Sequence, residues 1–288
     1  MNLARTRALL AERGLRLRRE LGQNYLVDDA RAAQLVAHAG VEPGDVVVEV
    51  GTGLGTLTRA LAARAARVVT IEIDAGVVAA LRDLALLPDA VELVHADALD
   101  VDLAALVPPP PARTRLVANL PYSAATPLLR RMLDLRDTFA SWSVMVQREV
   151  AARLVAGAGE DDYGSFAVLH ALAARVERVV DVAPQAFFPV PKVVSSFVRI
   201  TPLRGEGEPD RDELARIERV VRALFARRRK TIKNGLEGGG FGAAGLEALA
   251  RVGIDARERA ERLEPAALRA LARALDELGA FARPGPRD

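Results

Sequence analysis

The chain has no cysteine and few histidines, which removes the side chains on which most protein metal sites depend. Without cysteine there is no disulfide and no thiolate ligand. The three histidines, His38, His95 and His170, are too far apart in the sequence to form a ligand motif. We therefore expect no metal site and look for chemistry in other groups.

Long apolar runs are also missing. Of the 288 residues 50% are hydrophobic, but Arg, Asp, Glu or Gly interrupts every apolar stretch before it reaches the ~20 residues of a membrane span. Arg5 and Arg7 are not followed by the apolar segment and cleavage site of a secretory signal. We expect a soluble, cytoplasmic protein with one sizeable core and a smaller companion domain.

The net charge is only +2, so the distribution of charge says more than its sum. Basic residues, nearly all of them arginine, form two clusters. Guanidinium groups pair bidentately with phosphate oxygens, so either cluster suits contact with a nucleic acid, although each also suits a solvated helix face. The first cluster is Arg13, Arg16, Arg18 and Arg19, and the second is Arg227, Arg228, Arg229, Lys230 and Lys233.

Short β-branched segments alternate with Ala-rich amphipathic segments after a mostly helical stretch at 1–40. This alternation is typical of a parallel sheet with helices on both faces. Two later segments, 176–182 and 196–200, suit an antiparallel pair at one edge, which makes about seven strands. The first five strands are expected at 46–50, 67–73, 91–94, 115–118 and 143–146.

A polar segment at 203–212, containing Gly and Pro, is typical of a linker. Beyond it, 213–236 carries apolar residues at helical spacing, and 265–278 has the N-terminal proline of a final helix. We therefore expect two domains. Residues 1–204 form an α/β domain with an N-terminal helical segment, and residues 205–288 form a small all-α domain.

The first expected strand runs into a glycine turn that suits close approach of a ligand to the backbone. Gly51, Gly53 and Gly55 follow the strand, and glycine has no Cβ and tolerates positive φ. The dinucleotide fingerprint requires another glycine where this chain has Thr56. The turn therefore favours the amino-acid portion of S-adenosylmethionine over a pyrophosphate, with another nucleotide-like ligand as the alternative.

Acidic side chains follow the next two expected strands. Glu72 lies about 20 residues beyond the glycines, where a carboxylate can accept both ribose hydroxyls. Asp97 follows the third strand and suits the adenine amino group, whereas Asp74 better suits a helix cap. Together with the glycine turn, these acids predict an S-adenosylmethionine site.

The fourth expected strand ends in Asn119-Leu120-Pro121-Tyr122. The exocyclic amine of adenine is a poor nucleophile because its lone pair is delocalised into the ring. The Asn119 side-chain oxygen and the Leu120 carbonyl would favour a pyramidal nitrogen and aim its lone pair at the methyl group. Pro121 fixes the backbone, and Tyr122 can stack on an extruded base. A plain turn after a strand is the alternative.

Two further aromatic segments suit the same pocket. Prolines hold 187–193 extended, and Phe187 is the candidate for clamping the opposite face of the adenine. Phe188 better suits the core. Tyr25, in the loop at 21–26, suits either the lining of the pocket or simple packing of the loop.

These residues resemble a specific family, the small-subunit rRNA adenine dimethyltransferases, which are related to the erythromycin-resistance rRNA methylases. The resemblance covers nearly the whole chain and implies a Rossmann-like class I methyltransferase fold. Its blocks lie at 21–26, 51–55, 119–122, 145–154, 187–195 and 224–231. It places S-adenosylmethionine contacts at Asn24, Leu26, Gly51, Glu72, Asp97 and Asn119, to which the glycine turn adds Gly53.

Leu120 and the basic block at 224–231 resemble the small-subunit enzymes more than the resistance methylases. The resemblance then implies dimethylation of two adjacent adenines in the 3′-terminal hairpin of small-subunit rRNA during ribosome biogenesis. Catalysis falls to Asn119, Leu120 and Tyr122, and base stacking to Tyr122 and Phe187. Arg227, Arg228, Arg229 and Lys230 would contact the rRNA of an immature subunit, and we expect a monomer.

Two positions depart from the family pattern, and two alternatives stay open. Thr52 stands where the family usually has Pro, and Ser123 where it usually has Asn, which bears on turn rigidity and pocket polarity. A DNA adenine methyltransferase needs the same amine chemistry but also a target-recognition domain, for which the short helical tail leaves little room. A catalytically idle assembly or transcription factor could lose Asn119 or Tyr122, and this chain has both.

Overall fold

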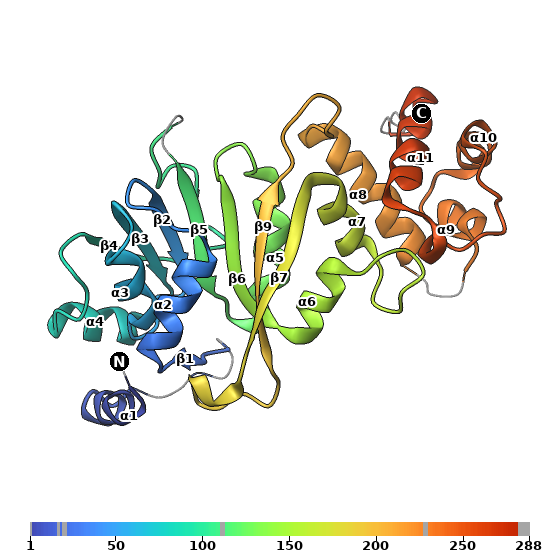
Figure 1. Ribbon diagram of the computed structural model, residues 1–288. Coiled ribbons are helices and arrows are strands. Elements are labelled where there is room, and N and C mark those ends of the chain that lie inside the picture. Colours follow the sequence, from blue (N-terminus) through green and yellow to red (C-terminus); the bar gives the residue numbers. More distant parts are fainter. Residues whose placement is uncertain (1, 16–17, 19–21, 110–112, 227–229, 282–288) are drawn as a thin grey trace, which may run out of the picture. The chain divides into compact units, whose positions relative to one another are not determined.

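The structure is a computed structural model that describes residues 2–15, 18, 22–109, 113–226 and 230–281. Its centre is a seven-stranded sheet with the strand order β4-β3-β2-β5-β6-β9-β7 (Figure 1). The expected seven-stranded, mostly parallel sheet is thereby confirmed. The strands are β2 (Val46–Val50), β3 (Arg67–Glu72), β4 (Val91–His95), β5 (Thr114–Asn119), β6 (Ser141–Gln147), β7 (Ala174–Val182) and β9 (Ser195–Pro202).

The five strands β4, β3, β2, β5 and β6 are parallel to one another. The central strands are almost wholly buried, as β-branched strands covered on both faces should be. Val50 is the register partner of both Ile71 and Ala118, so the carboxyl ends of three strands meet at one edge of the sheet. The residues that follow these strands therefore lie together.

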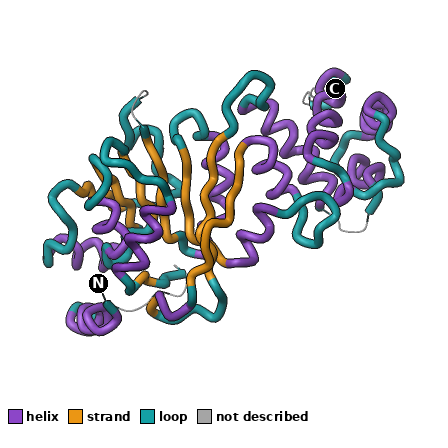
Figure 2. Tube along the Cα trace, viewed as in Figure 1, coloured by secondary structure: helices purple, strands orange, loops and turns teal. Residues whose placement is uncertain are grey.

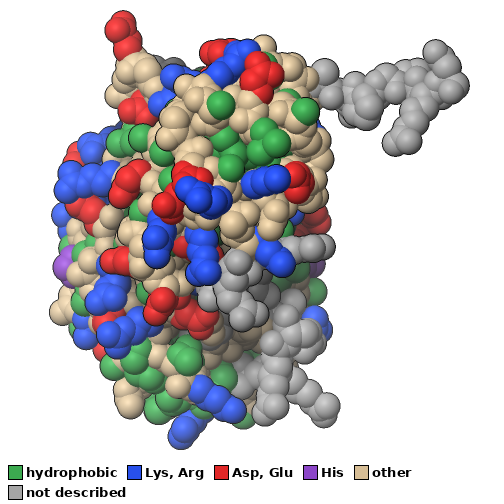
Figure 3. Space-filling view, turned by 90° about the vertical axis from the view of Figure 1, so that its right-hand side faces the viewer, with side chains coloured by type: hydrophobic (Ala, Val, Ile, Leu, Met, Phe, Trp, Pro, Cys, Tyr) green, Lys and Arg blue, Asp and Glu red, His purple; other side chains and the backbone are tan. Residues whose placement is uncertain are grey.

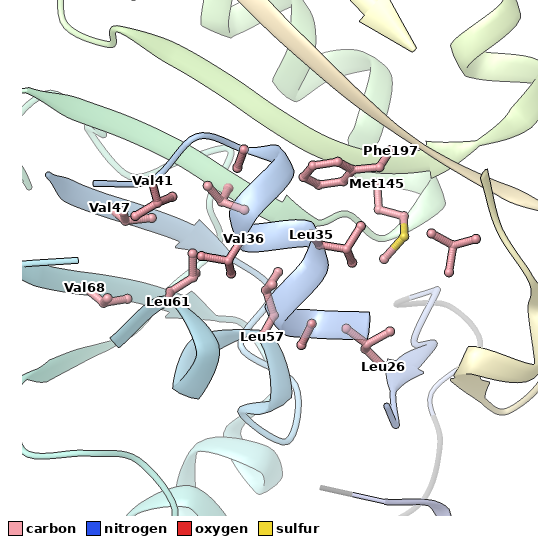
Figure 4. Close-up of a cluster of buried hydrophobic side chains, with 14 of the residues drawn as sticks. Leu26, Leu35, Val36, Val41, Val47, Leu57, Leu61, Val68, Met145 and Phe197 are labelled. Carbon is pink, nitrogen blue, oxygen red and sulfur yellow. The ribbon is translucent and has the colours of Figure 1, made fainter. Parts of the chain in front are cut away.

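Helices cover both faces of this sheet (Figures 1 and 2). Helices α2 (Asp29–His38) and α3 (Thr56–Ala62) pack on one face, and α5 (Tyr122–Asp134) lies on the other. Leu35 and Leu61, from α2 and α3, point into a buried apolar cluster with side chains of the sheet (Figure 4). Helix α4 (Ala75–Asp83) follows β3.

The last two strands form the expected pair at one edge. Strand β9 pairs antiparallel with β6, and β7 lies outermost. The Ser196 hydroxyl donates to Asp181 at 2.7 Å, and the Arg199 guanidinium donates to Glu177 at 2.6 Å. Since the numbering rises along β9 while it falls along β7, these two strands run antiparallel.

The N-terminal segment adds a feature that the sequence analysis treated as a loop. After α1 (Leu3–Glu12), strand β1 (Tyr25–Leu26) pairs antiparallel with β8 (Phe187–Phe188). Because its partner is far along the chain, no local pattern marks β1 as a strand. The pair brings Tyr25 and Leu26 against the start of the Pro-rich block at 187–195.

The chain divides into two compact units. The first contains residues 1–151 and 176–202, and the second contains residues 152–175 and 203–288. The segment 152–175, which the sequence analysis assigned to the first domain, thus groups with the C-terminal helices. Helix α6 (Arg148–Val155) spans this division, and the second unit contains α7 (Ser165–Ala173), α8 (Arg211–Phe225), α9 (Ile232–Gly238), α10 (Gly242–Val252) and α11 (Pro265–Glu277).

The segment 213–236, in which apolar residues recur at helical spacing, forms parts of two helices in the structure, α8 and α9. Thr231 caps the second of these helices, since its hydroxyl accepts from the Asn234 amide at 3.4 Å. Basic and acidic side chains are interspersed on the face shown in Figure 3, in keeping with the small net charge. None of the described helices combines the length and apolarity needed to cross a bilayer.

Candidate active site

A cavity of about 280 Å³ opens at the carboxyl edge of β2, β3 and β5, within the first unit. Its walls come from the N-terminal segment, the glycine turn, the ends of three strands and the start of α5. The structure brings together there nearly all the residues expected to bind the cofactor or the base. These are Asn24, Leu26, Gly51, Gly53, Glu72, Asp97, Asn119, Leu120 and Phe187.

The glycine turn has the backbone conformation for which glycine was expected. Gly51, Gly53 and Gly55 have φ values of 83°, 53° and 75°. A Cβ on Gly53 would lie 2.9 Å from Cδ1 of Tyr25, a ring that lines the same cavity. Gly55 is the residue before α3, so the turn leads directly into that helix. Backbone and ligand can therefore approach closely at this wall.

Glu72 fixes the turn from the neighbouring strand. One of its carboxylate oxygens accepts from the Gly53 amide and the other from the Asp74 amide, both at 2.9 Å. Burial raises the pKa of the Glu72 carboxyl, and these backbone donors oppose the rise. Each oxygen keeps a second lone pair for a ligand hydroxyl. Asp74 caps α4 through Gly76 and Val77, which confirms the role expected for it.

Asp97 lines the cavity from the segment that follows β4. Its Oδ1 accepts from the Leu99 amide at 2.8 Å, which shapes the segment. The Arg131 guanidinium of α5 reaches the same segment and donates to the Ala98 and Leu99 carbonyls at 2.8 and 2.9 Å. The Asp97 carboxylate is thus held by its own loop, and that loop by an arginine.

Asn119 ends β5 at the floor of the cavity. Its Nδ2 donates to the Asn24 carbonyl at 2.9 Å, which leaves Oδ1 as the acceptor for a ligand. Leu120 is buried, and its amide donates to the Met145 carbonyl at 3.3 Å. Tyr122 is the first residue of α5, but its side chain lies outside the described part of the structure. Its stacking role stays a prediction.

Phe187 forms part of the cavity wall. It is only 2% exposed and is the register partner of Leu26. Phe188 is half-buried and packs against a buried apolar cluster that contains Leu9 and Tyr25, and the Arg7 guanidinium lies 5.3 Å from its ring centroid. Tyr25 both packs and lines the cavity, and burial beside Glu72 raises the pKa of its phenol.

A family model described as ribosomal RNA adenine dimethylase matches residues 14–277 of this chain. The chain belongs to this family. The resemblance noted from the sequence motifs is thereby confirmed, and the chain is an enzyme of the rRNA adenine dimethyltransferase class.

Curated relatives agree over nearly the whole length. The ribosomal RNA small subunit methyltransferase A of Geobacter metallireducens is 40% identical over 270 residues, 92% of this chain and 98% of the relative. The protein of the same name from Deinococcus radiodurans is 40% identical over 273 residues, covering 94% and 90%.

Solved structures agree in fold. A dimethyladenosine transferase from Plasmodium falciparum superposes with a TM-score of 0.72 at 23% identity, covering 88% of this chain and 98% of the other. The 23S rRNA methyltransferase ErmE gives 0.62 at 28% identity, covering 88% and 100%. The expected Rossmann-like methyltransferase fold is therefore confirmed for this member of the dimethylase family.

Sequence reasoning missed several side chains that support the site in this dimethylase. Gln23 donates to Asp74 at 2.8 Å and accepts from the Arg18 amide at 2.9 Å, which holds the N-terminal segment on α4. Arg131 was also missed. The pattern of an amphipathic helix does not indicate which of its arginines contacts a neighbouring loop. Gln23 lies in the 21–26 block that resembles the family, and this was the signal that could have located it.

A buried polar chain beneath the turn was also missed. One oxygen of the Glu49 carboxyl group accepts from the Thr58 and Thr70 hydroxyls, both at 2.6 Å, and the Thr70 hydroxyl lies 2.7 Å from that of Thr52. Thr52, at a position where the family usually has proline, is thus tied into the sheet by hydrogen bonding. A charged residue within the VVVEV strand was the signal that could have located this network.

The expected RNA contacts lie mostly outside the described residues. Arg227, Arg228 and Arg229 belong to that undescribed segment, and Lys230, which follows it, is exposed. Their role in binding RNA stays a prediction.

Proposed function

We propose that this dimethyltransferase binds S-adenosylmethionine in the cavity and transfers its methyl groups to two adjacent adenines in the 3′-terminal hairpin of small-subunit rRNA. Each N6 amine receives two methyl groups, so four cofactor molecules are consumed and four molecules of S-adenosylhomocysteine are formed. The substrate is an immature small ribosomal subunit, and the enzyme acts as a cytoplasmic monomer. The observation that carries this proposal is the position of Asn119 and Leu120 beside the glycine turn and two acids in one cavity.

The cavity residues match the three parts of S-adenosylmethionine. The glycine turn suits the amino-acid portion, where a Cβ would block the approach. Glu72 suits the ribose hydroxyls, and Asp97 suits the adenine amino group. Asn24 and Leu26 complete the wall from the N-terminal segment. The methyl group would then face the end of β5.

Asn119 and Leu120 suit the second substrate. The target adenine leaves its stack, because its amine cannot otherwise reach a pair of acceptors inside the cavity. In the first transfer Asn119 Oδ1 and the Leu120 carbonyl accept its two N–H bonds, and in the second transfer one of them accepts the N–H that remains. Each time the nitrogen lone pair points at the methyl group, the C–S bond breaks to leave S-adenosylhomocysteine, and one proton of the alkylated amine passes to water. No strong base is required, since the amine becomes acidic as it is alkylated. Phe187 and Tyr122 hold the two faces of the base.

The test is a methyl-transfer assay with labelled S-adenosylmethionine and three substrates: undermethylated small subunits, naked rRNA and duplex DNA. Nucleoside analysis should find dimethyladenosine in the subunit sample. Asn119→Ala should abolish it, whereas Gln34→Ala, which removes an exposed amide from α2, should not. If only the DNA sample contained a product, monomethyladenine, the substrate would be DNA and not rRNA. Cofactor binding without transfer to any RNA would instead support an idle assembly factor.

A further inference from the structure

The loop at 189–194 presents two apolar side chains to solvent. Val190 is 59% exposed and Val193 is 42% exposed. Val190 is the most exposed large apolar side chain in the described part of the chain. Two prolines, Pro189 and Pro191, flank Val190 and restrict the backbone of the loop. A stiff loop that carries exposed apolar side chains suits contact with another molecule.

Both ends of this loop are fixed at the catalytic edge of the sheet. Before it, β8 supplies Phe187 to the cavity wall and pairs with β1. After it, the Val194 carbonyl accepts from the Arg148 amide at 3.0 Å, directly beyond β6. Strand β6 is the neighbour of β5, and Met145 is the register partner of Asn119. The loop is therefore joined at one end to the cavity wall through Phe187, and at the other to the strand that pairs with the end of β5 at Asn119.

An extruded adenine leaves a gap in the stack from which it came. Proteins that unstack bases often fill such a gap with an apolar side chain, which offsets part of the lost stacking. Basic side chains beside the apolar pair suit the adjacent phosphates. Lys192 lies between the two valines and is exposed. The Arg148 side chain at the end of the loop is 59% exposed and lies 3.9 Å from the Asp181 carboxylate, a long contact that a phosphate can replace.

We infer that Val190 and Val193 form a wedge that enters the RNA stack beside the target adenine and stabilises the extruded state. This inference rests on the proposed function and assigns a new role to residues outside the cavity. The partner that these two valines contact is the base step next to the target adenine. These valines are positioning residues, because they touch neither the cofactor nor the amine.

The test compares single-turnover methyl transfer on two kinds of undermethylated subunit. One carries the native hairpin, and the other keeps both target adenines but carries uridine at the position that flanks the pair, which weakens stacking there. The variants are Val190→Ser combined with Val193→Ser, the conservative Val190→Leu, and Leu246→Ser as a control. Leu246 is 42% exposed on α10 in the other unit.

The double serine variant should slow transfer on native subunits about tenfold, and the uridine substitution should restore most of that loss. Val190→Leu and Leu246→Ser should transfer at the wild-type rate, and cofactor affinity should be unchanged in all variants. An undiminished rate in the double variant, or an equal loss on both subunits, overturns the wedge. Weaker subunit binding with normal transfer at saturation also overturns it and points to a docking surface for protein. Failure of the wild-type enzyme on every RNA would instead overturn the proposed function.

Discussion

Glu49 lies wholly inside the parallel sheet, with no exposed surface, directly before the glycine turn. Burial raises the pKa of its carboxyl to about 8, and the charge of Glu72 adds to the rise. Hydrogen bonds from Thr58 and Thr70 and the charge of Arg59 act in the opposite direction. At neutral pH the folded protein therefore holds most of this carboxyl protonated.

Glu49→Gln should make stability less sensitive to alkaline pH. The folded pKa is raised above the unfolded value, so the contribution of Glu49 to stability is fully present below pH ~4.5 and is lost as pH rises towards 8. Glutamine has no proton to lose and keeps an oxygen for the two threonines. Relative to wild type, the variant should gain about 2–3 kcal/mol between pH 5.5 and 8.5, measured by urea unfolding. A pH-independent difference would contradict this assignment.

Gly53→Ala should weaken cofactor binding at least tenfold. The residue has a φ of 53°, which disfavours a side chain, and the new Cβ would lie 2.9 Å from the Tyr25 ring. Calorimetry with S-adenosylmethionine measures the effect. Gly44→Ala is the matched control, because a Cβ there meets no atom within 4 Å. Equal affinities for the two variants would show that the turn tolerates a Cβ.

Sequence patterns sufficed for the residues that directly follow the central strands. Gly51, Glu72, Asp97 and Asn119 meet in one cavity because parallel strands in register bring their carboxyl ends together. The partners of these residues were not predictable in the same way. Which atom Gln23 contacts depends on how the N-terminal segment crosses α4, and a local pattern carries no such information.

At the scale of elements, strands that a local pattern marks were predictable, and a strand that depends on a distant partner was not. The five parallel strands were predictable from β-branched composition and spacing. Strand β1 has only two residues and depends on β8, which lies more than 150 residues further along the chain. The division of 213–236 into α8 and α9 was also hidden, because both parts keep apolar residues at helical spacing.

In the second unit, Glu213 joins α8 to α11. Its carboxylate accepts from Arg269 at 2.7 Å and from Arg273 at 2.6 Å. These two guanidinium groups lower the pKa of Glu213 to about 2. The side chain is only 13% exposed, so solvent screens the pair less than it screens a surface ion pair.

Glu213→Gln should lower the melting temperature at pH 7 and have little effect near pH 2. Because the folded pKa is depressed, the contribution of the carboxylate is present above about pH 4.5 and is lost as pH falls towards 2. Thermal melts followed by circular dichroism at pH 7, 4 and 2.5 measure this change. Glu247→Gln is the control, since its pair with Arg251 is exposed. A destabilisation that persists undiminished at pH 2.5 would assign the loss to packing instead.

At the scale of the whole molecule, the two units show different limits of the sequence patterns. The first unit contains every residue of the cavity, and its chemistry follows from the order of its strands. The second unit includes residues 152–175 from the middle of the chain. No change in composition marks this segment, so its membership depends on helix packing that the sequence pattern does not show. Because the net charge is small, we expect RNA binding to depend on local clusters of basic side chains rather than on attraction by the protein as a whole.

The most direct test of the account is single-turnover transfer from S-adenosylmethionine to undermethylated subunits by Asn119→Ala and Asn119→Asp, with cofactor affinity measured in parallel. Asn119→Ala removes the acceptor and should lower the transfer rate by about 10²–10³, the effect of losing one preorganised group at a reacting centre. Asn119→Asp keeps an acceptor but loses the Nδ2 hydrogen bond to the Asn24 carbonyl, so its rate should fall between those of wild type and Asn119→Ala. Because both variants lose this hydrogen bond, cofactor affinity should fall to a similar extent in both, and the difference between their rates measures the acceptor. A rate in Asn119→Ala within a few-fold of wild type would contradict the claim that Asn119 aligns the adenine amine.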